Sequence, residues 1–113
     1  MTKDQDGGFI ETLEVVRRAA GQRVLFLPHA VRQMARPERM ITTEEVRSVL
    51  ERGEVIEDYP EDARGHSCLM LGVGTEGRRL HVVCSPKEGY LAIVTAYLPL
   101  EQEWESDSRT RRI

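Results

Sequence analysis

The sequence has few cysteines, few aromatic residues and almost no lysine, and these shortages narrow what the chain can be. Two cysteines in 113 residues are too few for a disulfide framework, so the core must come from apolar packing. No apolar run approaches the roughly 20 residues that a helix needs to cross a bilayer, and the first residues lack the apolar stretch of a signal peptide. We therefore expect a cytoplasmic protein with no membrane partner.

The length and composition predict one folded domain. A chain of 113 residues, 40% hydrophobic and 31% charged, has the size and balance of a single globular unit. We expect a flexible N-terminal tail at residues 1–8, a single domain at residues 9–105 and a charged C-terminal tail at residues 106–113.

Charge is unevenly distributed. The net charge of −3 argues against a general binder of polyanions. Residues 17–39, however, hold six arginines and one acid, whereas residues 42–64 hold eight acids and three arginines. Lys3 and Lys87 are the only lysines, and arginine is the better bidentate ligand for phosphate. A genome rich in arginine codons explains the same bias, so both interpretations stay open.

Three helices are predicted in the first half of the chain. Residues 9–20 carry apolar side chains at helical spacing and form a first helix that Gly21 is expected to end. Residues 29–36 form a second helix that ends before Pro37. Thr42 and Glu45 have the spacing of a capping box and begin a third helix that ends at Gly53.

After Gly53 the apolar pattern changes to period two, which is typical of strands. Four strands are expected, at residues 54–59, 67–73, 78–84 and 90–98. Short, turn-rich links favour antiparallel neighbours, and residues 23–27 supply a fifth strand. The predicted fold class is α+β, with N-terminal helices packed on a four- or five-stranded, largely antiparallel sheet.

A small set of side chains suits metal-independent RNA cleavage. That reaction needs a base for the ribose 2′-hydroxyl, an acid for the leaving oxygen and a cation for the charged phosphorane. The candidate catalytic residues are His29, His81 and Tyr97, and the candidate phosphate contacts are Arg32, Arg36 and Arg39.

These candidates imply a definite geometry. We expect His81 and Tyr97 to share one face of the sheet, with His29 and at least one of the three arginines approaching from its rim. In the alternative interpretation, His81 and Tyr97 are hydrogen-bonded core residues and His29 caps a helix.

A second constellation has the ligand types of a zinc site. It consists of His66, Cys68, His81 and Cys84. Residues 81 and 84 differ by three, so they point to opposite sheet faces unless a bulge intervenes. We therefore expect no metal or other cofactor, and a small zinc-binding protein stays as the weaker alternative.

Several ordered motifs run from about residue 24 to residue 105. They are His29, Ala30, Gln33 and Met34; Arg39 and Ile41 before the capped helix; Gly53, Glu54, Ile56, Tyr59 and Pro60; Leu80 to Val83; Thr95, Tyr97 and Pro99; and Trp104. In these motifs the chain resembles the bacterial domain-of-unknown-function family 4258. The segment at residues 36–40 is about two residues longer than the family's usual spacing.

The resemblance carries expectations about fold, activity and partners. The family is similar to the RelE/BrnT-like superfamily of small toxins, many of which are ribonucleases that act on messenger RNA. It implies a RelE/BrnT-like fold and a toxin-like, metal-independent endoribonuclease, with RNA as substrate and a zinc-finger antitoxin as partner. The acidic pI of about 5.6 argues against a close copy of RelE. The alternative is a non-catalytic protein-interaction module.

Overall fold

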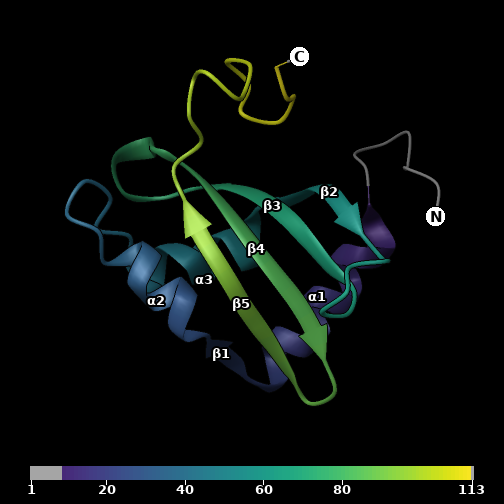
Figure 1. Cartoon of the computed structure of the whole chain (residues 1–113). Coiled ribbons are helices and arrows are strands. Elements are labelled where there is room, and N and C mark those ends of the chain that lie inside the picture. Colours follow the sequence, from purple (N-terminus) through teal and green to yellow (C-terminus); the bar gives the residue numbers. More distant parts are fainter. Residues whose placement is uncertain (1–8, 113) are drawn as a thin grey trace.

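The computed structural model describes residues 9–112 as a five-stranded sheet with helices against one of its faces (Figure 1). The elements in chain order are α1 (Ile10–Gln22), β1 (Val24–Phe26), α2 (Pro28–Met34), α3 (Thr43–Arg52), β2 (Glu54–Tyr59), β3 (Ser67–Val73), the 3₁₀ turn η1 (Thr75–Gly77), β4 (Arg79–Lys87) and β5 (Tyr90–Tyr97). The predicted α+β class is confirmed. No helix among the described residues is long and apolar enough to span a membrane.

The sheet is an antiparallel meander with one added strand. Its order is β1-β5-β4-β3-β2, in which β2 to β5 pair antiparallel and β1 pairs parallel to β5. The short connections between β2 and β5 produce the meander, because tight turns reverse the chain onto its neighbour. The parallel pairing of β1 with β5 is possible because the connection between them, which contains α2, α3 and three strands, is long enough to return the chain in the same direction.

Local sequence explains how the helices begin and end. The capping box of α3 is confirmed: the Thr42 side chain accepts from the Glu45 amide at 3.0 Å, and the Glu45 carboxylate accepts from the Thr42 amide at 3.0 Å. α2 begins at Pro28, whose missing N–H is harmless in a first turn. The prediction that Gly21 ends α1 was wrong, since this glycine lies inside a helix that continues to Gln22.

The core lies between the helices and one sheet face. Val16, Val46 and Val49 of the helices pack with buried strand residues such as Leu80 and Val82. Side chains alternate along a strand, so His81 and Val83, which alternate with Leu80 and Val82 along β4, point to the other face. We call this second surface the outer face.

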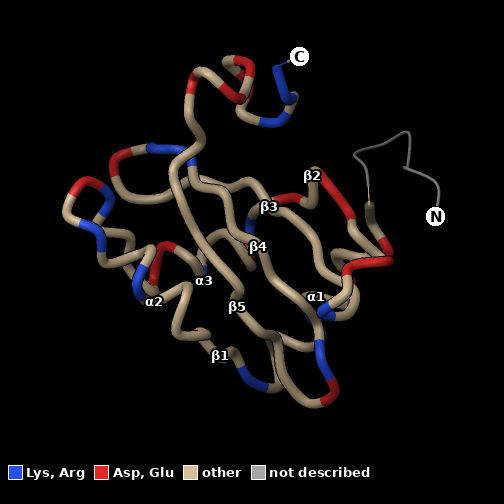
Figure 2. Tube along the Cα trace, viewed as in Figure 1, with Lys and Arg blue, Asp and Glu red and all other residues tan. Residues whose placement is uncertain are grey.

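The chain after β5 folds back onto the outer face. Residues 99–112, here called the C-terminal segment, carry acids first and arginines last (Figure 2). Trp104 is buried at 2% exposure, and it forms an isolated β-bridge with Arg111. Residues 106–112 therefore lie against the domain and do not extend from it as a separate tail. The predicted N-terminal tail, residues 1–8, lies outside the described residues.

Candidate functional site

His81 and Tyr97 meet on the outer face of the sheet. They are direct partners across β4 and β5, so their side chains project from the same face, as the sequence predicted. Their rings contact edge to face, with centroids 5.3 Å apart. A bulge in β5 sets this register: Val83 pairs with Thr95 and Cys84 pairs with Ile93, so Val94 is left unpaired and every pair beyond it moves by one residue.

The His81 imidazole is sealed beneath the C-terminal segment. Its side chain has no exposed surface, and the indole of Trp104 lies edge to face at 4.4 Å between centroids. Nε2 donates to the carbonyl of Ser108 at 2.6 Å, whereas Nδ1 has no hydrogen-bond partner among the described residues. Burial lowers the pKa of His81, against the smaller effect of the Ser108 carbonyl. The ring is therefore neutral, and its Nδ1 is an acceptor without a hydrogen-bond donor among the described residues.

A carboxylate and a guanidinium lie close enough to this ring to affect its pKa. Arg111 donates to both oxygens of Glu57, through Nε at 2.7 Å and Nη2 at 3.0 Å, and its guanidinium lies 4.6 Å from the centroid of Trp104. The hydroxyl of Tyr59 also donates to Glu57. Burial acts to raise the pKa of Glu57, but the hydrogen bonds from Arg111 and Tyr59 lower it below its ordinary value. Glu57 is thus ionised at neutral pH.

The two phenols on this face keep their protons. Burial, followed by the hydrogen bond to Glu57, raises the pKa of Tyr59 to about 12. Burial likewise raises the pKa of Tyr97. Charge on Glu57 raises the pKa of His81, and charge on Arg111 lowers it, so the three groups share one electrostatic environment. The outer face therefore collects a base, proton donors and a cation.

Three members of this cluster, Glu57, Tyr59 and Arg111, were not predicted as site residues from the sequence. Glu57 and Tyr59 are two residues apart on β2, and the period of a strand places both on one face. That signal was present, but it could not show which face is shared with His81. Arg111 lies 54 residues from Glu57 in a segment without regular structure, and no local pattern predicts its return.

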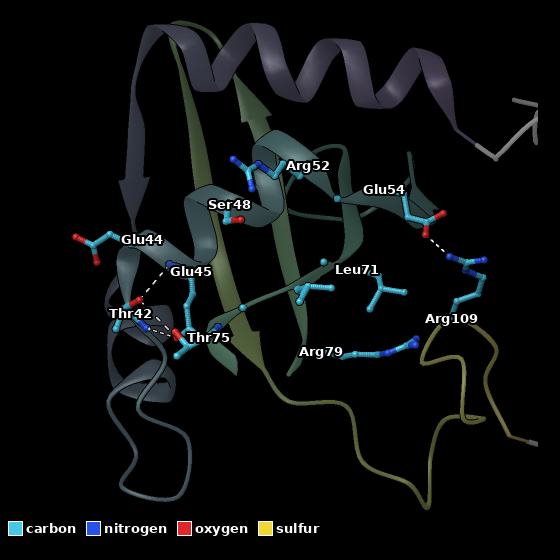
Figure 3. A pocket seen from close by; sticks show the side chains of 14 residues that line it. Thr42, Glu44, Glu45, Ser48, Arg52, Glu54, Leu71, Thr75, Arg79 and Arg109 are labelled. Atoms are coloured by element: carbon cyan, nitrogen blue, oxygen red, sulfur yellow. Dashed lines mark hydrogen bonds and ion pairs between the residues drawn. The ribbon is translucent and has the colours of Figure 1, made fainter. Parts of the chain in front are cut away.

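A groove of about 690 Å³ adjoins the cluster (Figure 3). It runs along the end of β3 between α3 and the C-terminal segment, and Leu71 at its floor is the cross-strand partner of His81. Its polar lining combines three arginines, three carboxylates and three hydroxyls: Arg52, Arg79 and Arg109; Glu44, Glu45 and Glu54; and Thr42, Ser48 and Thr75.

Two of these arginines are tied to other parts of the chain. Arg109 bonds Glu54, and Arg79 Nη1 donates to the Asp107 carbonyl at 2.6 Å. Both bonds join the C-terminal segment to the strands that flank the groove.

The other predicted site residues do not reach the outer face. α2 packs through Ala30 and Met34 into the core on the helix side, so the sheet separates His29 and Arg32 from His81. Both of these side chains are exposed. The expectation that they approach from the rim was wrong, because the short α2 covers β5 from the opposite side.

The remaining two arginines are engaged near α2. Arg36 pairs with Glu38 at 2.7 Å, and Arg39 Nη1 donates to the Gln33 side chain at 2.8 Å. The structure records no contact of either arginine with His81 or Tyr97 among the residues it describes.

The four residues of the zinc alternative diverge. The thiols of Cys68 and Cys84 lie 3.8 Å apart in the helix-side core, while His81 projects from the outer face. His66 bonds Asp58 instead. The hydrogen bond with Cys68, together with burial, raises the pKa of the Cys84 thiol and keeps it protonated. Within residues 9–112 no three histidine, cysteine or acidic side chains are placed to hold a metal ion.

Comparison with known proteins places the chain in a family without assigning an activity. No curated protein matches it, and no solved structure matches it. The family described as "Domain of unknown function (DUF4258)" matches residues 26–98, which include His81 and Tyr97 and exclude Trp104 and Arg111. Because the match spans more than half of the 113 residues, the protein belongs to this family of domains of unknown function.

Proposed function

We propose that the protein is a toxin-like, metal-independent endoribonuclease that cleaves messenger RNA in the cytoplasm. The observation that carries the proposal is the buried His81 ring with its unpaired Nδ1, set between Tyr97 and the Glu57–Arg111 pair. A buried polar atom without a partner costs about 1–3 kcal/mol, which a purely structural side chain would avoid. Functional sites are where such costs are retained.

The chemistry assigns one role to each group. His81, neutral because its pKa is lowered, takes the 2′-hydroxyl proton as that oxygen bonds to phosphorus. The bond from phosphorus to the 5′-oxygen breaks, and this oxygen takes a proton from Tyr97, whose raised pKa keeps it protonated beforehand. His81 then returns its proton to Tyr97. Arg111 neutralises the negative charge that develops on the phosphorane.

RNA reaches these groups when Trp104 and Ser108 of the C-terminal segment move off the His81 ring, while Arg111 of the same segment exchanges Glu57 for the RNA phosphate. The segment is held in part by the pairs Arg109–Glu54 and Arg111–Glu57, in which both arginines are more than half exposed. Such pairs contribute only about 0–1 kcal/mol each, so RNA phosphates compete for the same guanidinium groups. The groove arginines, Arg52 and Arg79, extend the backbone contacts.

Induced expression tests the proposal, because the family resemblance also implies an antitoxin encoded nearby. The gene is expressed alone and together with its neighbour, and growth and transcript integrity are scored. We expect growth arrest and broken transcripts with the gene alone, and rescue by the neighbour or by Tyr97→Phe. Full growth with intact transcripts, despite folded protein in the cells, would refute the toxin function.

One observation favours a non-catalytic interaction module instead. His81 is completely enclosed by Trp104 and the Ser108 carbonyl, as expected of a side chain that anchors the C-terminal segment. In that case Tyr97→Phe would leave growth and transcripts as in the wild type, while Trp104→Ala would weaken only folding and partner binding.

A further inference from the structure

We propose a phosphate-binding site in a second groove, between α1 and the end of β4. This groove has a volume of about 320 Å³ and is lined by Arg18, Gln22, His66 and Lys87 above an apolar wall. It lies on the helix side and shares no lining residue with the groove of Figure 3. The inference is therefore independent of the proposed RNA cleavage.

The position of His66 is fixed by hydrogen bonds of its ring and of its backbone carbonyl. Its Nε2 bonds the Asp58 carboxylate at 2.6 Å, and the Asp58 side chain is 5% exposed. Thr12 donates to the second oxygen of Asp58 at 3.1 Å, and Ser85 donates to the His66 carbonyl at 2.5 Å. The imidazole, at 36% side-chain exposure, is thus oriented by a buried carboxylate, which is how proteins prepare a histidine for a ligand.

The second nitrogen of this ring is available. Nδ1 of His66 has no hydrogen-bond partner among residues 9–112, although its ring lines the groove. When Nε2–H donates to Asp58, Nδ1 is an acceptor in the neutral ring and a donor in the imidazolium. An anion in the groove can receive the hydrogen bond that Nδ1 donates in the imidazolium.

Two cations complete the site. Lys87 is fixed by donating Nζ to the Arg64 carbonyl at 2.6 Å, which leaves further N–H groups of the ammonium for a ligand. Arg18 and Gln22 are four residues apart on α1 and so lie on one helix face. The lining contains no carboxylate, in a protein whose net charge is −3.

This donor set fits phosphate better than a carboxylate. A guanidinium, an ammonium, an imidazolium and an amide offer more donors than the two oxygens of a carboxylate can accept, whereas phosphate presents several oxygens in a tetrahedral array. The ligand is inorganic phosphate or the phosphate of a nucleotide chain, since both present the same oxygens to these donors.

Titration followed by NMR tests the site, with the backbone amides of Gln22 and Lys87 as reporters in every variant and the His66 ring as a further reporter where it is present. The probes are inorganic phosphate, a short RNA with a 5′-phosphate, and the same RNA with a 5′-hydroxyl. We expect saturable shifts with at least one probe, and about tenfold weaker binding in Arg18→Gln and in His66→Gln, the loss typical of one charge-assisted hydrogen bond. Arg23→Gln removes the same charge beside the end of α1 without touching the groove, and it should bind as the wild type does.

The three probes distinguish the source of the phosphate. If inorganic phosphate and the 5′-phosphorylated RNA bind but the 5′-hydroxyl RNA does not, the ligand is a terminal phosphate. If both RNAs bind equally, the ligand is the phosphodiester backbone. No saturable shift with any probe, or an equal loss in Arg23→Gln and Arg18→Gln, would overturn the assignment. Neither result depends on whether the protein cleaves RNA.

Discussion

Replacement of Glu45 by glutamine tests how the groove of Figure 3 is built. Glu45 is buried at 5% exposure and caps α3 through the Thr42 amide. It also accepts from the Thr75 amide at 2.7 Å and from Arg78, through Nε at 3.0 Å and Nη2 at 2.8 Å. One carboxylate therefore joins α3 to the loop between β3 and β4, which together form a wall of the groove.

The contribution of Glu45 to the free energy of unfolding follows from the pKa of its carboxyl group. The Arg78 hydrogen bond, opposed by burial and aided by the two amides, lowers the pKa of Glu45 from 4.5 to about 2. Each pKa unit corresponds to about 1.4 kcal/mol, so ionised Glu45 contributes about 3 kcal/mol to the free energy of unfolding. Because the folded pKa is the lower one, this contribution is present above pH 4.5 and is lost as the pH falls toward 2.

Urea unfolding followed by circular dichroism from pH 7 to pH 2 measures the effect. At pH 7, Glu45→Gln should lower the free energy of unfolding by about 3 kcal/mol, although glutamine keeps the cap of α3. The difference from wild type should shrink as acid protonates Glu45. Glu44→Gln, at an exposed neighbour, should change stability by less than about 0.5 kcal/mol. A constant difference across the pH range would refute the assigned role of the Glu45 charge.

Three further outcomes are expected. Gly72→Ala should lower the free energy of unfolding in urea by about 1–3 kcal/mol, because the added Cβ would lie 2.7 Å from the Val49 side chain of α3. Gly21→Ala, which has open space around it, should be neutral or stabilising. Equal effects of the two substitutions would contradict the close approach of Gly72 to α3. Thr42→Ala should lose about 1 kcal/mol of stability with the N-cap, and no loss would show that the cap contributes nothing. Trp104→Ala should raise the pKa of His81 toward its ordinary value in an NMR titration, because water reaches the ring; an unchanged pKa would show that burial by Trp104 is not the cause.

Local signals in the sequence were sufficient for most of the fold. The capping box of α3 and the period-two strands predicted their elements, and short turns predicted the meander. The parallel pairing of β1 with β5 had no local signal, since it joins segments more than 60 residues apart. The extent of α1 was mispredicted because packing of Val16 and Ala19 outweighs the low helix propensity of Gly21.

The candidate site was only partly predictable. The prediction that His81 and Tyr97 share one face is confirmed, and the bulge in β5 makes them direct partners. His29 was grouped with them by chemistry alone, and a list of residue types cannot show which side of a sheet a helix covers. The contacts of Trp104 and Arg111 depend on the return of the C-terminal segment, which is set by tertiary packing and not by periodicity.

Cleavage of RNA by the purified protein in EDTA tests the central proposal most directly. The wild type should cut a single-stranded RNA and leave 2′,3′-cyclic phosphate ends, since the 2′-hydroxyl is the nucleophile. His81→Asn and Tyr97→Phe, each shown to be folded by circular dichroism, should be slower by about 100-fold or more, the usual loss for an acid–base group. His29→Asn, on the opposite side of the sheet, should cleave at the wild-type rate. No cleavage by folded wild-type protein, or equal rates in all four proteins, would contradict the proposed ribonuclease.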